Sequence, residues 1–290
     1  MFKVDNAVIM AAGTSSRFAP ISYERPKALI EVRGEVLIER QIRQLQEAGI
    51  NDIYIVTGYR AADFDYLKEK YGVKIRENTL YNIRNNHSSI YLVRDVLKNS
   101  YICSADNYFT VNPFSLEIEE SYYSALYSEG ETSEWCMTCD EEGYIKNVVV
   151  GGRDSWYMLG HVFWSEEFSK HFVEILEREY ALPETNNKLW EDIFIDHLDE
   201  FKMKIHKYKD GEIYEFDTLD ELRKFDKSYI TDARSNVLDD IADILRVSQK
   251  ELNHFKCIKG KGNEAVGVEL ECKGMVYSYD YKTKKLELKG

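Results

Sequence analysis

The stretch Ala7-Val8-Ile9-Met10-Ala11-Ala12-Gly13-Thr14-Ser15-Ser16-Arg17 changes from an apolar run to a loop of small residues within a few positions. A short apolar run bounded by such residues is typical of a buried strand. Amphipathic and apolar segments then alternate at 37–48, 53–57, 62–71, 88–97 and 101–105. This order predicts an α/β, Rossmann-like fold with a mixed, mostly parallel sheet flanked by helices. Because ligands bind at the carboxyl ends of parallel strands, we expect the active site just after Ala12 and Ala105.

The pattern changes after residue 122. Aromatic and β-branched residues at 122–127, 135–139, 144–150 and 158–164 predict strands of a more antiparallel lid region. We expect helices at 166–180 and 188–198, a strand near 203–208, an extended segment at 212–217 and a short helix from 219 to about 225. A helix at 235–247 and small strands joined by glycine-bearing turns follow. The predicted organisation is a large domain at 1–229 and a small α+β extension at 230–290.

Composition excludes several classes of protein. The chain of 290 residues carries 51 acidic and 38 basic residues, a net charge of −13, so it has no electrostatic footprint for nucleic acid or an anionic membrane. No segment approaches the roughly 20 apolar residues that span a bilayer, and the N-terminus lacks a signal-peptide pattern. The five cysteines are scattered and odd in number, which argues against a disulfide framework. We therefore expect a cytoplasmic protein without membrane insertion.

The loop after the first strand is a candidate phosphate-binding site. Small residues at Ala11, Ala12, Gly13, Thr14 and Ser15 leave backbone N–H groups free to face phosphate oxygens. Arg17 and Lys27 add cationic partners for the same oxygens, and we predict that they carry catalysis. The loop has neither the ending of a Walker A motif nor the spacing of G-x-G-x-x-G. The alternative is an ordinary strand-to-helix turn followed by two surface cations.

An acidic residue, Asp106, follows the apolar run at 101–105, where the end of a strand would place it to hold a metal ion. Magnesium prefers one or two carboxylates together with substrate phosphates. The segment Tyr214-Glu215-Phe216-Asp217 supplies the second carboxylate, with Asp217 the first choice and Glu215 on the same face of an extended strand. A turn-forming role for Asp106 is the alternative.

Aromatic residues are frequent in the second half of the chain, among them Trp135 and Trp190, the latter followed by Glu191 and Asp192. Aromatic rings around a quaternary ammonium supply cation–π attraction of about 0.5–2 kcal/mol each, and carboxylates add charge complementarity. These four residues are candidates for binding a cationic substrate. Packing in the core is the alternative role for each tryptophan.

Together, Ala11-Ala-Gly…Arg17…Pro26-Lys27, Asp106-Asn-Tyr and Tyr214-Glu-Phe-Asp217 resemble the nucleotidyltransferase superfamily of sugar-nucleotide pyrophosphorylases, and within it the bacterial phosphocholine cytidylyltransferases. The likeness runs from about residue 6 to 225 and includes Gly58-Tyr59, Asn85-Asn86, Glu134-Trp135 and Trp190-Glu-Asp192. It implies that Ala12, Gly13, Arg17 and Lys27 hold the triphosphate of CTP, and that residues 81–89, with Tyr81, Asn85 and Ser89, contact cytosine and ribose. Ala105, at the end of its predicted strand, is a further candidate for binding the nucleotide. It also implies that Asp106 and Asp217 hold Mg²⁺, and that Trp135 and Trp190 enclose the trimethylammonium group.

The resemblance implies a transferase that moves CMP from CTP to phosphocholine, giving CDP-choline and pyrophosphate. Ser15 stands where the family often has a second glycine, and His87, Ser88 and Leu189 stand where we associate aromatic residues with the choline pocket. A smaller acceptor, 2-aminoethylphosphonate, is therefore an alternative. A sugar 1-phosphate nucleotidyltransferase and a nucleotide-binding regulatory module without turnover are further alternatives.

The tail from about residue 235, with Phe255-Lys-Cys-Ile-Lys-Gly-Lys-Gly-Asn-Glu264, resembles the opening of a choline-kinase N-lobe. A kinase also needs a catalytic-loop aspartate and a metal-binding aspartate on a C-lobe. The chain does not contain that lobe, so we expect no kinase activity, and fusion or association with a choline kinase is a hypothesis.

Overall fold

The computed structural model describes residues 1–261 and 264–289. Its contacts divide the chain into two compact units, the first formed by residues 1–13 and 37–215 and the second by residues 14–36 and 216–290. The predicted boundary after Tyr229 divides the sequence at a different place, and it stays a prediction.

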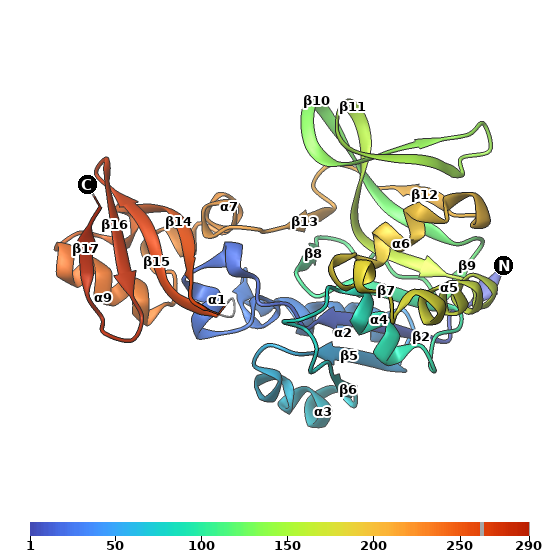
Figure 1. Cartoon of the computed structure of the whole chain (residues 1–290), viewed down its shortest axis with the longest axis horizontal. Coiled ribbons are helices and arrows are strands. Elements are labelled where there is room, and N and C mark those ends of the chain that lie inside the picture. Colours follow the sequence, from blue (N-terminus) through green and yellow to red (C-terminus); the bar gives the residue numbers. More distant parts are fainter. Residues whose placement is uncertain (262–263, 290) are drawn as a thin grey trace. The chain divides into compact units, whose positions relative to one another are not determined.

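The first unit is built on a seven-stranded sheet with the order β12-β10-β11-β7-β2-β5-β6 (Figure 1). Its strands are β2 (Asn6–Ala11), β5 (Ile53–Thr57), β6 (Lys74–Glu77), β7 (Ser100–Ser104), β10 (Tyr122–Cys139), β11 (Ile145–Trp164) and β12 (Lys204–Lys207). Strands β7, β2, β5 and β6 are parallel, whereas β11 runs antiparallel to β7 and to β10. The predicted mixed, mostly parallel α/β sheet is confirmed.

Helices connect the parallel strands as the alternating pattern predicts. The helices of this unit are α2 (Leu37–Glu47), α3 (Tyr66–Tyr71), α4 (His87–Val93), α5 (Glu166–Glu179) and α6 (Trp190–Asp196), with 3₁₀ turns η3 (Ala61–Phe64), η4 (Pro183–Asn187) and η5 (Leu198–Glu200). Buried residues of α4, α5 and α6 join Val8, Val56 and Ile102 of the sheet in one apolar cluster. Short strands β1 (Phe2–Lys3) and β9 (Glu117–Ile118) form a separate two-stranded sheet, and β8 (Asn107–Phe109) pairs with β13 (Ile213–Glu215) in another.

The predicted lid region is antiparallel, but its four expected strands are two long ones. Residues 122–127 and 135–139 belong to β10, and 144–150 and 158–164 fall almost wholly within β11. Bulges interrupt the pairing between Ser128 and Trp135. The intervening residues are mostly exposed and polar. The apolar pattern is therefore interrupted there, although the strand continues.

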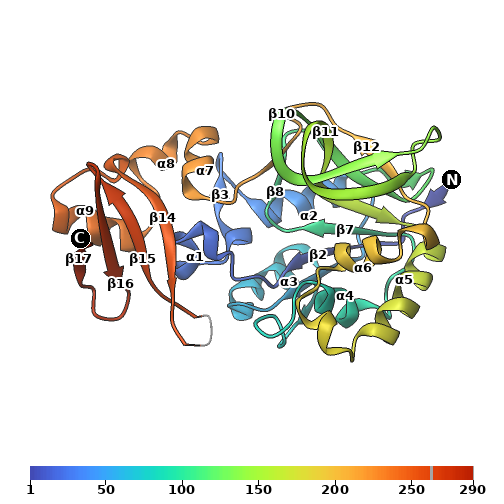
Figure 2. The ribbon, with the colours of Figure 1, turned by 45° about the horizontal axis from the view of Figure 1, so that its top comes forward.

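The second unit contains a four-stranded antiparallel sheet with the order β14-β15-β16-β17, and α9 lies along one face of it (Figures 1 and 2). Its elements are η1 (Ser16–Phe18), α1 (Ile21–Glu24), η2 (Lys27–Leu29), β3 (Glu31–Val32), β4 (Glu35–Val36), α7 (Leu219–Phe225), α8 (Ser228–Thr231), α9 (Asn236–Leu245), η6 (Gln249–Glu251), β14 (Leu252–Lys259), β15 (Ala265–Cys272), β16 (Met275–Asp280) and β17 (Leu286–Leu288). Leu238 and Ile241 of α9 are buried, as are Val268 and Leu270 of β15. This confirms an extension of one helix and paired strands; its kinase-lobe likeness stays a prediction, and Gly262 and Asn263 of that likeness lie outside the described residues.

All five cysteines are free thiols, and Cys136 and Cys139 lie on β10 as expected. No helix in residues 1–261 and 264–289 is long and apolar enough to cross a bilayer.

Candidate active site

The carboxyl ends of β2 and β7 meet at one edge of the first unit's sheet. The strands pair in parallel with Met10 opposite Ser104, and the Ala105 N–H donates to the Met10 carbonyl at 3.2 Å. The residues that follow, Ala12 and Asp106, therefore leave the sheet side by side. This is the edge at which the alternating pattern predicts the active site, and parallel sheets bind ligands there.

Gly58, directly after β5, sits closely against the same edge. The Tyr59 N–H donates to the Ala12 carbonyl at 3.0 Å. A Cβ added to Gly58 would lie 2.8 Å from the Tyr81 Cβ and 2.9 Å from the Ala12 carbonyl oxygen. A glycine at position 58 thus lets Tyr81, a predicted nucleotide contact, lie against the end of β2.

Gly13 has the opposite surroundings. A Cβ added there would meet no atom of the described residues within 4 Å. The packing of the described protein atoms therefore does not require a glycine, which fits a position that a ligand approaches.

We expect Gly58→Ala to weaken CTP binding about tenfold, because Tyr81 and the end of β2 must separate and small displacements of binding groups are costly. Calorimetric titration of CTP with Mg²⁺ measures the loss. Gly13→Ala is the matched comparison: it should weaken CTP binding while leaving the melting temperature unchanged, whereas Gly58→Ala should lower both. Unchanged CTP affinity in both variants would contradict a nucleotide site at this edge.

The segment predicted to contact cytosine and ribose is tied to the segment before α6. Asn85 donates to the carbonyls of Asn186 and Asn187 at 3.0 Å each, and the His87 Nδ1 lies 2.7 Å from the Lys188 carbonyl. Burial lowers the pKa of His87. The hydroxyl of Ser89 is buried and accepts a hydrogen bond from the Asn78 amide at 3.1 Å. Asn85 is thus exposed on a fixed segment, while Ser89 helps to hold that segment in place.

The residues around Glu191 form a second cluster, which we call the head-group cluster: Asn86, Tyr123, Trp190 and Glu191. The Asn86 amide donates to Glu191 at 3.1 Å, and the Tyr123 hydroxyl donates to the other carboxylate oxygen at 3.3 Å. Tyr123 also stacks on Trp190, with 5.8 Å between ring centroids. Burial raises the pKa of Glu191 to about 7.

Three predicted members of the acceptor site have structural contacts of their own. Trp190 is 1% exposed and packs edge-on against Trp164 at 5.1 Å, so it belongs to the core. The Asp192 carboxylate accepts the Leu189 N–H at 2.6 Å and so caps α6. Trp135, on β10, packs at the edge of the same core. For these three residues, contact with substrate stays a prediction.

Asp106 lies in the turn between β7 and β8, and that turn is held from α2. The buried Gln41 side chain donates to the carbonyls of Ser104 and Asn107, at 2.8 and 2.9 Å, on either side of Asp106. Sequence reasoning missed Gln41. Its signal was available: a glutamine on the apolar face of an amphipathic helix needs buried partners.

Glu215 is brought close to this turn by strand pairing, because β13 pairs with β8 and Glu215 lies opposite Asn107. Asp106 and Glu215 thus supply hard carboxylate oxygens from neighbouring segments, which fits a Mg²⁺ ion that takes its remaining ligands from phosphates and water. In the part of the chain that the structure describes, no group of three His, Cys, Asp or Glu residues is placed to hold a metal by itself.

The second unit brings the other predicted charged residues together. Arg17 lies 2.6 Å from one Asp217 oxygen, and the Lys27 Nζ lies 3.7 Å from the other. Lys27 is only 4% exposed, whereas the Arg17 side chain is 74% exposed. Asp217 precedes α7, and its N–H donates to Glu221 of that helix at 2.7 Å. Residues 14–36, which carry both cations, are called the nucleotide loop below. Within this loop Ser15 has a φ of +48°, a backbone conformation that favours glycine.

Known proteins resemble this chain in sequence and in fold. A protein-family model described as a MobA-like NTP transferase domain matches residues 7–112. The choline-phosphate cytidylyltransferase of Streptococcus pneumoniae is 36% identical over 221 residues, which cover 76% of this chain and 96% of that protein. The 2-aminoethylphosphonate cytidylyltransferase of Lancefieldella rimae is 35% identical over 234 residues, covering 79% of this chain and 95% of that protein.

A solved structure of the CTP:phosphocholine cytidylyltransferase from Streptococcus pneumoniae matches with a TM-score of 0.75 at 35% identity, over 78% of this chain and 99% of that one. A glucose-1-phosphate thymidylyltransferase structure from Bacillus anthracis, at 17% identity and a TM-score of 0.64, shares the fold. Nucleotidyltransferases of this kind generally use a divalent metal ion. The chain belongs to the nucleotidyltransferases, in the family of the choline-phosphate and 2-aminoethylphosphonate cytidylyltransferases.

Proposed function

We propose that this enzyme transfers CMP from CTP to phosphocholine, giving CDP-choline and pyrophosphate. The observation that carries the proposal is the 36% identity to a choline-phosphate cytidylyltransferase over 96% of that protein. A cationic acceptor also suits the head-group cluster, where a half-buried carboxylate lies beside two stacked aromatic rings. A cytoplasmic location and association with a choline kinase stay predictions.

The reaction is an in-line attack of the acceptor phosphate on the α-phosphorus of CTP, with pyrophosphate leaving. A phosphomonoester has its second pKa near 6, so its oxygen is ionised at neutral pH and needs no general base. Ala11, Ala12 and Gly13 offer backbone to the triphosphate, while Arg17 and Lys27 neutralise its charge. Mg²⁺, when bound, would add positive charge to the phosphates; Asp106 with Asp217 or Glu215 would hold it.

Thr14 and Ser15 complete the loop in this proposal, and Tyr81, Asn85 and Ala105 contact the nucleoside. The supporting observation is that Tyr81, Ala12 and Ala105 share one edge of the sheet. A nucleoside bound at that edge places its phosphates at the strand ends, where such sheets bind phosphate.

The competing acceptor is 2-aminoethylphosphonate, favoured by the 35% identity to an enzyme named for it. Pyrophosphate release with CTP and Mg²⁺ should be compared for phosphocholine, 2-aminoethylphosphonate and glucose 1-phosphate at equal concentration. We expect phosphocholine to give the highest kcat/KM. Preference for the phosphonate would keep the mechanism and change the acceptor. Absence of pyrophosphate release with all three acceptors would support a regulatory module without turnover.

Glu191→Gln tests the head-group cluster through its pH dependence. Glu191 is protonated below its pKa of about 7 and ionised above it, so attraction to a cation grows as pH rises. We expect the KM for phosphocholine to be about fivefold to tenfold higher in Glu191→Gln than in the wild type at pH 8, and the two values to converge at pH 6. The acceptor's own phosphate titrates equally in both enzymes, so the ratio of the two KM values isolates Glu191.

Stability gives an independent control for the same variant. A carboxyl group whose pKa is higher in the folded than in the unfolded chain loses stabilising proton binding as pH rises, here from about 4.5 to about 7. Raising the pH from 5 to 8 should therefore lower the melting temperature of the wild type. The same change of pH should lower the melting temperature of Glu191→Gln by less. A KM ratio that does not change with pH would exclude Glu191 from the acceptor site.

A further inference from the structure

Within the second unit, helix α1 sits in the nucleotide loop between the two predicted phosphate-binding cations. It begins four residues after Arg17 and ends three residues before Lys27. Ile21 of α1 is buried, so the helix is packed on that side. Contacts with the other residues of α1 therefore act on the segment that joins the two cations.

Tyr23 and Glu24 of α1 contact the C-terminal extension. The Tyr23 ring stacks on the ring of Tyr281, with 3.9 Å between centroids and 18° between planes. Glu24 accepts hydrogen bonds from the Ser235 hydroxyl and from the backbone and side chain of Asn236, the latter two at 2.8 and 3.1 Å. A carboxylate at the start of α9 is favourable because it meets free N–H groups and the positive end of the helix dipole.

The flanks of the loop are held in the same way. Arg25 donates to the Arg234 carbonyl at 3.2 Å, and the Glu31 carbonyl accepts hydrogen bonds from Tyr229 and Arg234 at 2.5 and 3.1 Å. The 3₁₀ turn η1, which contains Arg17, lies against β14. Contacts with residues 229–281 thus occur along most of the loop.

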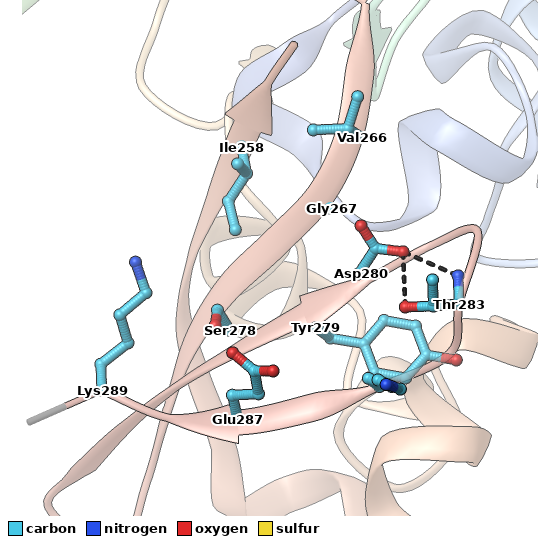
Figure 3. Close-up of a pocket in the computed structure, with 10 residues that line it drawn as sticks. Ile258, Val266, Gly267, Ser278, Tyr279, Asp280, Thr283, Glu287 and Lys289 are labelled. Atoms are coloured by element: carbon cyan, nitrogen blue, oxygen red, sulfur yellow. Dashed lines mark hydrogen bonds between the residues drawn. The ribbon is translucent and has the colours of Figure 1, made fainter.

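The segment that carries Tyr281 is itself well ordered by hydrogen bonds. Asp280 accepts from the backbone N–H groups of Lys282 and Thr283 and from the Thr283 hydroxyl, the bonds to Thr283 being drawn in Figure 3. The Tyr281 N–H donates to the Val266 carbonyl at 3.0 Å. The same turn borders a hollow of about 300 Å³ on the sheet, lined by Ser278, Lys285 and Glu287 among others (Figure 3). Tyr281 is therefore presented from a fixed turn.

We propose that the C-terminal extension positions the nucleotide loop: Tyr281 and the first turn of α9 hold α1, and through α1 they place Arg17 and Lys27 for the triphosphate. This rests on the proposed function in that the two cations bind CTP. The Streptococcus pneumoniae relative aligns over 76% of this chain and 96% of its own length, so about a quarter of this chain lies outside that alignment.

Tyr281→Ala removes the ring that stacks on Tyr23 and is the decisive variant. We expect the KM and the calorimetric Kd for CTP with Mg²⁺ to rise about fivefold to tenfold, with the KM for the acceptor within about twofold of the wild type, because small shifts of positioning groups act on the bound group they orient. Tyr281→Phe keeps the ring and should restore CTP affinity to within about twofold.

Tyr277→Ala is the matched control, because Tyr277 lies on β16 of the same sheet and its hydroxyl contacts Met275 of that strand. It should lower the melting temperature without changing CTP affinity. Tyr23→Ala removes the stack from the other side at a half-exposed position, and it replaces Tyr281→Ala as the test if that variant folds poorly. The double variant should be no worse than either single one.

The outcomes separate this proposal from the function. Wild-type protein that releases no pyrophosphate with any of the three acceptors overturns the proposed function. Unchanged CTP affinity in folded Tyr281→Ala or Tyr23→Ala, or an equal loss in Tyr277→Ala, overturns the positioning role, because a merely structural contribution changes the folded fraction and not the affinity of the folded enzyme.

Discussion

Replacing Lys27 by methionine should lower kcat/KM for CMP transfer by about a hundredfold to a thousandfold, the range seen when one preorganised partner of a developing charge is removed. Lys27 is 4% exposed, and its ammonium group lies 3.7 Å from Asp217 and 5.9 Å from the centre of the Phe18 ring. A cation held in so little water interacts strongly with phosphate charge. Initial rates of pyrophosphate release at varied CTP concentration measure the loss.

The fold should survive this change. Methionine has nearly the length of the lysine stem and is apolar, and Asp217 keeps its ion pair with Arg17 at 2.6 Å. The melting temperature should therefore stay within a few degrees of the wild-type value. Near-normal turnover in Lys27→Met would contradict a role for Lys27 in binding the triphosphate.

Arg17→Met is the matched comparison. The Arg17 side chain is 74% exposed, so water screens its charge and its removal should reduce kcat/KM only about tenfold. An equal loss in both variants would indicate that burial of the lysine does not matter to its function.

The strand and helix order of the first unit could be predicted from sequence because each element has its own local pattern. The apolar runs at 7–12 and 101–105 predicted two parallel strands, and their pairing at Met10 and Ser104 follows from the topology of such folds. The sequence therefore predicts that Ala12 and Asp106 lie at one edge of the sheet.

Other features depend on contacts between residues far apart in the chain, which local patterns do not encode. Asp217 was predicted as a metal ligand, and its ion pairs with Arg17 and Lys27 join segments from opposite ends of the sequence. The grouping of residues 14–36 with the C-terminal extension has the same origin. The long strands β10 and β11 were divided in the prediction because an exposed polar stretch with bulges reads locally as a turn.

Asp106→Asn is the second change for which we expect a large effect, a loss in kcat/KM of about a hundredfold or more, because asparagine keeps the shape and removes the charge that a hard divalent ion prefers. The Mg²⁺ concentration for half-maximal rate should rise about tenfold or more. Gln41 holds the carbonyls on either side of Asp106, so the turn itself should be unchanged. Binding of Mn²⁺ with CTP, followed by calorimetry without acceptor, gives a readout that does not depend on turnover.

Comparison of Glu215→Gln with Asp217→Asn then separates the two candidates for the second carboxylate. Glu215 lies opposite Asn107, next to Asp106, whereas Asp217 is ion-paired with both cations. If Glu215 holds the metal, Glu215→Gln should raise the Mg²⁺ requirement, while Asp217→Asn should chiefly alter CTP affinity by releasing Arg17 and Lys27. If Asp217 holds it, as its place in the sequence motif predicts, Asp217→Asn should raise the Mg²⁺ requirement to the level of Asp106→Asn. If the Mg²⁺ requirement is unchanged in all three variants, none of the three predicted carboxylates is needed to bind the metal. That result would contradict a metal ion held by these carboxylates.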